Sequence, residues 1–151
     1  MNRIAWLKRF IHNARRPVAE RRSGALSPEE RREALAFWIR EAQQRAFPEE
    51  LRAERDGSLL PVRSTLAKCV LCVNDDGLLC AVPRTNEPPL IVLPEWEHVT
   101  VLIVDEGHRR SFHQGTRVTL AVLSGEYFVR RRTVRRVVEI CFKCRRYKGL
   151  P

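Results

Sequence analysis

A basic amphipathic stretch opens the chain. Apolar residues recur there at the three- and four-residue spacing of a helix, at Ile4, Leu7, Phe10 and Ile11. A breaker region that begins at Pro17 follows them. The pattern predicts a first helix within residues 1–15.

A helix start signal lies at Ser27-Pro28-Glu29-Glu30. Ser27 suits the N-cap, Pro28 suits the first helical position, and Glu30 can return a hydrogen bond to the cap amide. The residues that follow carry an apolar stripe at helical spacing: Leu35, Trp38, Ile39, Ala42 and Ala46. We therefore predict a second helix that uses this stripe as its packing surface.

Short apolar runs predict strands in the middle of the chain. Residues 67–73 and 78–82 flank Asn74-Asp75-Asp76-Gly77, whose turn-forming residues favour a β-hairpin. Leu90–Leu93, closed by Pro94, is a further short strand candidate.

From residue 95 onward the pattern is helical. Apolar residues at helical spacing precede His108, others fill residues 116–128, and residues 133–140 predict a last, basic helix. The expected fold class is α+β and mostly helical, with a small upstream subdomain that contains the hairpin followed by a helical bundle of helix-turn-helix type. The expected segments are a basic N-terminal helix and linker (1–26), a helix with the hairpin (27–93), and the bundle (94–151).

Composition favours a globular protein. Hydrophobic residues make up 44% and charged residues 30% of the chain. The apolar runs are much shorter than the roughly 18 residues that a membrane span needs. The N-terminal stretch also lacks the continuous apolar core of a secretory signal. We expect an intracellular protein, nuclear or cytoplasmic, with no membrane partner.

Two pairs of potential metal ligands stand out in the C-terminal third. Four residues separate His108 from His113, two separate Cys141 from Cys144, and 27 lie between the pairs. Both spacings can turn two side chains toward one tetrahedral Zn²⁺. A site closed by four protein ligands would be structural, with no position for a catalytic water. The alternative is chance, with two surface histidines and two buried cysteines.

The five cysteines are an odd number, which argues against a disulfide framework. Cys69, Cys72 and Cys80 are predicted to lie on the hairpin strands. Residues three apart on a strand point to opposite faces, so Cys69 and Cys72 would not converge. Strand packing is the favoured interpretation of this pair, and a redox role is the alternative.

Basic residues cluster near the metal-ligand pairs. The whole chain has 28 Lys and Arg against 18 Asp and Glu. This density favours a polyanionic partner, and a merely solubilising surface is the alternative. The residues expected to contact nucleic-acid phosphates are Arg130, Arg131, Arg132, Arg135, Arg136, Arg145, Arg146 and Lys148.

The segment from His108-x4-His113 to Cys141-x2-Cys144 resembles the N-terminal zinc-binding (HHCC) domain of retroviral and retrotransposon integrases. Motifs further upstream look like the polyprotein stretch that precedes the integrase in BEL/Pao-type LTR retrotransposons. These motifs are Phe37–Gln43, Phe47–Leu51, Asp76–Leu79 and Ile91–Pro94. The resemblance extends over residues 28 to 148, although Leu79-Cys80-Ala81-Val82 stands where the family commonly has a glycine-rich continuation.

The resemblance implies a small helical bundle around one zinc, with His108, His113, Cys141 and Cys144 as ligands. It places Tyr127-Phe128 in the core. Such domains help integrase to multimerise and to hold element DNA ends, while a separate Asp-Asp-Glu core performs strand transfer. That core would follow the zinc domain, and this chain reaches only Pro151. We therefore expect a non-catalytic DNA-binding module that associates with itself or with a full integrase.

Two other function classes stay open. In the first, zinc folds a protein-interaction surface and the charge has no nucleic-acid role. In the second, Cys69 and Cys72 form a redox-active pair.

Overall fold

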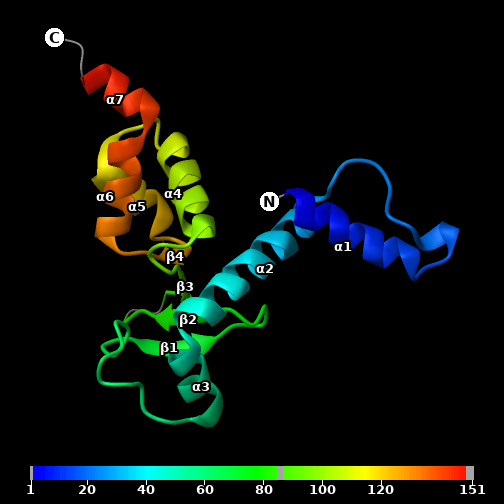
Figure 1. Cartoon of the computed structure of the whole chain (residues 1–151), viewed down its shortest axis with the longest axis horizontal. Coiled ribbons are helices and arrows are strands. Elements are labelled where there is room, and N and C mark those ends of the chain that lie inside the picture. Colours follow the sequence, from blue (N-terminus) through cyan, green and yellow to red (C-terminus); the bar gives the residue numbers. More distant parts are fainter. Residues whose placement is uncertain (1, 85–86, 149–151) are drawn as a thin grey trace. The chain divides into compact units, whose positions relative to one another are not determined.

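The computed structural model describes residues 2–84 and 87–148 (Figure 1). It is α+β and mostly helical, which confirms the predicted fold class. The chain forms two compact units, Met1–Ile39 and Arg40–Pro151, and the division falls within one long helix. No helix in the described part of the chain is long and apolar enough to cross a membrane.

The first unit contains α1 (Asn2–Ala14), a short 3-10 helix (Val18–Glu20) and the first turns of α2 (Pro28–Ala46). The predicted capping box is present. Ser27 Oγ accepts a hydrogen bond from the Glu30 amide at 3.2 Å, and the Glu30 carboxylate accepts one from the Ser27 amide at 2.8 Å. The small core of this unit comprises Ala5, Leu26 and Ala34.

A buried ion pair joins α1 to α2. Arg9 Nε donates to Glu30 Oε1 at 2.7 Å, and a second guanidinium nitrogen contacts the other carboxylate oxygen. The remaining Arg9 donors bind the Gly24 and Ala25 carbonyls at 2.6 and 2.9 Å. The Arg9 hydrogen bond, the Ser27 amide and the positive charge of Arg9 lower the pKa of Glu30 to about 2. Glu30 thus serves both the helix cap and the packing of α1.

The second unit begins with the end of α2 and with α3 (Pro48–Asp56), followed by a four-stranded sheet. Strands β1 (Val70–Val73), β2 (Leu79–Val82) and β3 (Leu90–Val92) pair antiparallel in order, and β3 pairs parallel with β4 (Tyr127–Phe128).

The predicted hairpin is confirmed as β1 and β2. Asn74 Oδ1 accepts a hydrogen bond from the Leu78 amide at 2.9 Å, and Gly77 adopts the left-handed φ of 69° that this turn requires. The strands are shorter than expected, and Cys69 lies just before β1. Its predicted strand position is therefore wrong, whereas Cys72 and Cys80 lie on strands and face each other in the register.

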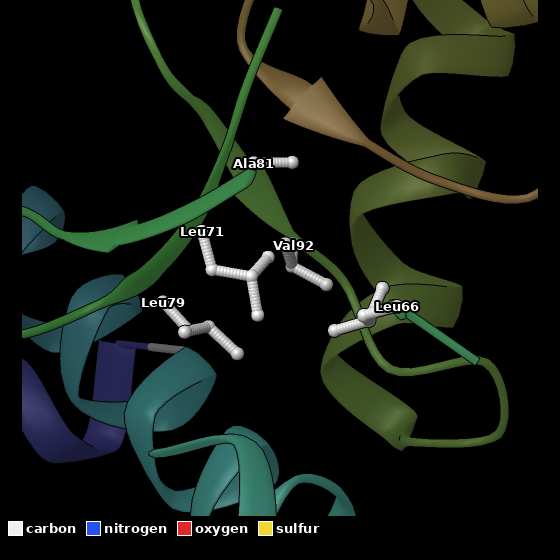
Figure 2. Close-up of a cluster of buried hydrophobic side chains, with 5 residues drawn as sticks. All are labelled: Leu66, Leu71, Leu79, Ala81 and Val92. Carbon is white, nitrogen blue, oxygen red and sulfur yellow. The ribbon is translucent and has the colours of Figure 1, made fainter. Parts of the chain in front are cut away.

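One face of the sheet carries an apolar core, drawn in Figure 2. The buried members come from both hairpin strands, β3 and the preceding loop, and they are Leu66, Leu71, Leu79, Ala81 and Val92. Phe47 and Leu51 pack against this cluster from the α3 region, and Phe128 packs against it from β4.

A buried amide connects α2 to the sheet. Gln43 Nε2 donates to the Leu79 and Val92 carbonyls at 2.9 and 2.7 Å, and Gln43 Oε1 accepts from the Leu79 amide at 2.8 Å. Leaving these backbone groups without partners in the core would be costly, so Gln43 fixes the helix against β2 and β3.

The helical bundle consists of α4 (His98–Arg110), α5 (Gly115–Leu123), α6 (Arg131–Ile140) and α7 (Phe142–Lys148). Its fully buried side chains include Val104 and Val134. The backbone of Gly107 approaches Leu123 so closely that a Cβ there would lie 2.8 Å from the leucine side chain. Glycine at this position therefore lets α4 and α5 pack.

Two predictions for the bundle were wrong. The helix expected to continue to residue 128 ends at Leu123, and Tyr127-Phe128 instead forms β4 beside β3. The helix ending at Ile140 is also not the last, because α7 follows it after Cys141. Of the pair that the resemblance placed in the core, Tyr127 is buried, whereas Phe128 is half-buried and packs against the core of the sheet.

The pKa of Glu30 generates a prediction for the first unit. A carboxyl group whose pKa falls from its ordinary 4.5 to about 2 on folding stabilises the folded state above pH 4.5, and this contribution is lost as the pH falls toward 2. Glu30→Gln should therefore lower the stability of this unit at pH 7 and flatten its dependence on pH between about 4.5 and 2.

Urea unfolding followed by Trp6 fluorescence, with Trp38 and Trp96 replaced by Phe, measures this effect, since Trp6 lies against Arg9. Glu33→Gln is the matched control because Glu33 is an exposed carboxylate that lies 4.0 Å from Lys8. Equal stability of Glu30→Gln and the parent protein at pH 7 would contradict the structural role of the ion pair.

Candidate metal centre

Four potential metal ligands converge at one end of the helical bundle. They are His108 in the last turn of α4, His113 in the turn that follows, Cys141 between α6 and α7, and Cys144 in α7. One ligand atom from each lies within 4.8 Å of the others. The sequence-predicted set is thus brought together, and this group could hold a metal ion.

The closest approaches show which atoms face the centre. His108 Nε2 lies 3.1 Å from Cys144 Sγ, and His113 Nδ1 lies 3.4 Å from Cys141 Sγ and 3.9 Å from Cys144 Sγ. The two imidazole rings stand 4.6 Å apart at an angle of 86°. Two nitrogens and two sulfurs suit a borderline-soft divalent transition metal.

A strained turn delivers His113. Phe112 and His113 both have left-handed backbones, with φ of 52° and 62°, a conformation that side-chain-bearing residues rarely adopt. The His113 amide donates to the His108 carbonyl at 3.0 Å, so the chain reverses tightly after α4. This reversal returns the second imidazole to the first, and such strain is typical of functional sites.

A helix break delivers the two cysteines. Cys141 leaves the helical conformation at the end of α6, with φ of −58° and ψ of 121°. Helix α7 starts at the next residue, and the Arg145 amide donates to the Cys141 carbonyl at 2.9 Å. Cys144 therefore lies one turn further on, and both sulfur atoms face the histidines.

His108 is held by a chain of hydrogen bonds. Its Nδ1 lies 3.0 Å from Thr119 Oγ1, and the Thr119 hydroxyl donates its proton to the Gly115 carbonyl at 2.8 Å. Thr119 must therefore accept from His108, which places the proton on Nδ1 and leaves the lone pair on Nε2 for a metal. Ser111 Oγ donates to the His108 carbonyl at 2.8 Å and supports the same turn.

The environment also favours the neutral form of His108. Its side chain is 0% exposed. Burial lowers the pKa of the imidazole and repulsion from His113 acts in the same direction, while Asp105 partly opposes both. A neutral imidazole with a free Nε2 is the form that binds a metal ion.

The geometry of this centre carries the functional interpretation by itself. No protein-family model matches the chain, and neither does any curated protein or solved structure.

Several of the arginines predicted to bind phosphate contact carboxylates of the same unit. Arg130 Nε lies 3.1 Å from Glu95, and Arg130 also donates to the Thr65 carbonyl at 2.9 Å. Arg132 donates to the same Glu95 carboxylate at 2.6 Å. Glu95 thus neutralises part of the charge at the start of α6.

The remaining predicted phosphate-binding residues include two arginines of α6 with partners in the protein and three exposed arginines. Arg135 donates to Glu139 at 2.7 Å, and the Arg136 guanidinium lies 4.6 Å from the centre of the Trp96 ring. The side chain of Lys148 is outside the described residues. Three others lie exposed beside the metal centre or at the start of α6, namely Arg131, Arg145 and Arg146.

The other cysteines form no second centre among the described residues. Burial raises the pKa of Cys72, and raises that of Cys80 to about 11. Both thiols are therefore protonated near neutral pH, which favours packing and argues against the reactive thiolate at Cys72 that a redox pair of Cys69 and Cys72 would use.

Sequence reasoning missed Thr119, Ser111 and Glu95. Thr119 approaches His108 only through the packing of α5 on α4, so no spacing rule reveals it. The sequence signal that could have identified Thr119 is a hydroxyl residue among apolar residues on the helix that follows the histidine pair. Glu95 gave no sequence signal that it would hold two arginines.

Thr119 should affect metal affinity although it does not contact the metal position. Thr119→Val removes the acceptor that orients His108, and loss of such a partner typically weakens metal binding about 10- to 100-fold. Thr119→Ser should retain most of the affinity. Titration with Co²⁺ against a competing chelator measures the change.

Thr100→Val is the matched control. Thr100 is a buried hydroxyl on α4, and within the described residues it has no hydrogen-bond partner. Its replacement should leave the Co²⁺ affinity unchanged. Equal affinities for Thr119→Val and the parent protein would refute the orienting role.

Proposed function

We propose that this chain is a zinc-folded, non-catalytic nucleic-acid-binding module of the integrase type, related to the polyprotein of BEL/Pao-type LTR retrotransposons. The observation that carries the proposal is the meeting of His108, His113, Cys141 and Cys144 within 4.8 Å. Two distant pairs with ligand spacing do not otherwise need to meet in the fold.

Zinc is the metal that fits this donor set best. Two imidazoles and two thiolates form a closed tetrahedral site, whereas catalytic zinc keeps one position open for water or substrate. Structural zinc contributes about 10–16 kcal/mol of apparent binding free energy to small domains. The proposed role of the metal is therefore to fold the segment rather than to perform chemistry.

The thin packing near the centre supports a folding role. Phe142 and Tyr147 of α7 are exposed, and Cys141 and Cys144 are only partly buried. Helix α7 thus gains little from hydrophobic burial. Bonds from a metal to Cys141 and Cys144 would supply the missing connection to α4 and its turn.

The packing of the sheet in the second unit supports the resemblance. Gln43 binds the backbone of Leu79 and Val92, and Phe47 and Leu51 pack on the core that includes those two side chains. Each of the four upstream motifs that resemble the retrotransposon polyprotein therefore contributes to one core. Motifs that pack together are expected to be retained together.

Nucleic-acid binding is proposed to depend on phosphate contacts. Arg145 and Arg146 are exposed on α7 beside the metal centre, and Arg131 is exposed at the start of α6. Arg132 and Arg135 have carboxylate partners that a phosphate could replace. Contacts of this kind hold the backbone of DNA without reading its sequence.

A protein-interaction role is the alternative. Ile140 and Phe142 are exposed apolar residues at the junction of α6 and α7, and such residues can contribute to a contact between proteins. A protein that associates with itself but has no affinity for DNA would favour this alternative.

Metal analysis tests the first half of the proposal. The purified protein should contain about one zinc per chain, as one structural site requires. Cys141→Ser should lose this zinc together with helicity in circular dichroism. Cys72→Ser, the same substitution outside the cluster, should change neither. Zinc retained in Cys141→Ser, or absent from the parent protein, would refute the proposed metal role.

Salt dependence tests the second half. For duplex DNA, log affinity decreases linearly with log salt, and the magnitude of this slope decreases by about 0.9 for each phosphate contact that is lost. The double variant Arg145→Ala with Arg146→Ala should therefore reduce the magnitude of the slope by about 2. The control is Arg52→Ala with Arg55→Ala, which removes the same charge from the exposed side of α3. An equal reduction in both double variants would show diffuse attraction rather than a binding surface.

A further inference from the structure

A hollow adjoins the metal centre on the side of the strained turn. Its volume is about 520 Å³, and it is lined by Phe112, His113, Lys143, Cys144 and Tyr147. Two of these residues are metal-ligand candidates, two are aromatic and one is cationic. The turn after α4 supplies one wall, and α7 supplies the other.

The aromatic side chains of the hollow are not explained by packing. Phe112 is 85% exposed and Tyr147 is 73% exposed. Phe112 also adopts a left-handed φ of 52°, which disfavours a bulky residue. An exposed aromatic in a strained conformation stabilises the fold little, which indicates a binding role.

The charge around the hollow selects an anionic ligand. Lys143 lines it, and none of the described lining residues is acidic. Arg145 and Arg146 are exposed on the same short helix. Flat aromatic faces next to cationic side chains are the combination that binds single-stranded nucleic acid, because bases stack on the rings and phosphates pair with the charges.

We infer that this hollow binds an unpaired nucleotide of a single-stranded or frayed nucleic acid. The base stacks on Phe112 and Tyr147, and Lys143 contacts a neighbouring phosphate. This inference rests on the proposed nucleic-acid function and adds the form of nucleic acid that the site takes. A paired base is already stacked on both faces, so the hollow selects unpaired nucleotides over duplex.

Metal binding and nucleotide binding are coupled in this arrangement. His113 belongs to one wall of the hollow and Cys144 to the other, and their ligand atoms lie 3.9 Å apart. A metal bound to both fixes the distance between Phe112 and Tyr147. Removal of the metal should therefore weaken binding to single strands.

Fluorescence anisotropy of the full chain, loaded with Zn²⁺, tests the inference with a labelled 12-nucleotide thymidine strand and a 12-base-pair duplex. Loss of one stacking partner typically weakens single-strand binding about 5- to 100-fold. Phe112→Ala and Tyr147→Ala should show losses in this range for the strand and changes below about twofold for the duplex. Tyr147→Phe should preserve binding.

Two further variants keep the test independent of folding. Phe142→Ala is the matched control, because Phe142 is 77% exposed on the same helix but does not line the hollow. Phe112→Asn accommodates the left-handed backbone without an aromatic ring, so it should keep the Co²⁺ spectrum of the parent and still lose strand affinity.

Each outcome separates this inference from the proposed function. If Phe112→Ala and Tyr147→Ala leave strand binding unchanged while duplex binding persists, the inference about the hollow is wrong and the proposed function stands. An equal loss in Phe142→Ala also overturns the inference about the hollow. Absence of binding to both nucleic acids overturns the proposed function as well. Loss of self-association in Phe112→Ala, with strand affinity intact, would assign the hollow to a protein partner and overturn the inference.

Discussion

The helical bundle depends on one geometric constraint, namely that four donor atoms from two distant parts of the chain meet at a point. Satisfying it requires a left-handed reversal at Phe112 and His113 after α4, and a break at Cys141 between α6 and α7. Neither feature favours the fold by itself, since one strains the backbone and the other interrupts a helix. Both become favourable if the donors share a metal, because metal–ligand bonds exceed such local costs.

Charge and burial divide the unit into an inner part that orients ligands and an outer part that is open to a partner. Inside, Thr119 fixes the proton of His108 on Nδ1, and burial lowers the pKa of that imidazole and so favours its neutral form. Outside, Glu95 holds Arg130 and Arg132, so the charge at the start of α6 is partly neutralised. Arg145 and Arg146 are exposed on α7, the helix that also carries the candidate ligand Cys144.

Features set by near neighbours in the chain could be predicted from sequence. The capping box at Ser27 and the hairpin turn at Asn74 use side chains within a few residues, and each histidine or cysteine pair has its own ligand spacing. Features set by distant neighbours could not. Tyr127-Phe128 fits a helical pattern, but pairing with Ile91 and Val92 makes it a strand. Thr119 and Glu95 acquire their roles only after α4, α5 and α6 have packed.

A closed metal site suits binding rather than catalysis. With all four positions filled by protein atoms, a metal has no place for substrate, so its influence passes through the walls that it joins. His113 and Cys144 belong to those walls, and Phe112 and Tyr147 stand beside them. With a metal bound, a ligand that contacts both rings would find their separation already fixed, and it would avoid the entropic cost of ordering them. A metal held at this centre would thus act on binding through preorganisation of the surface.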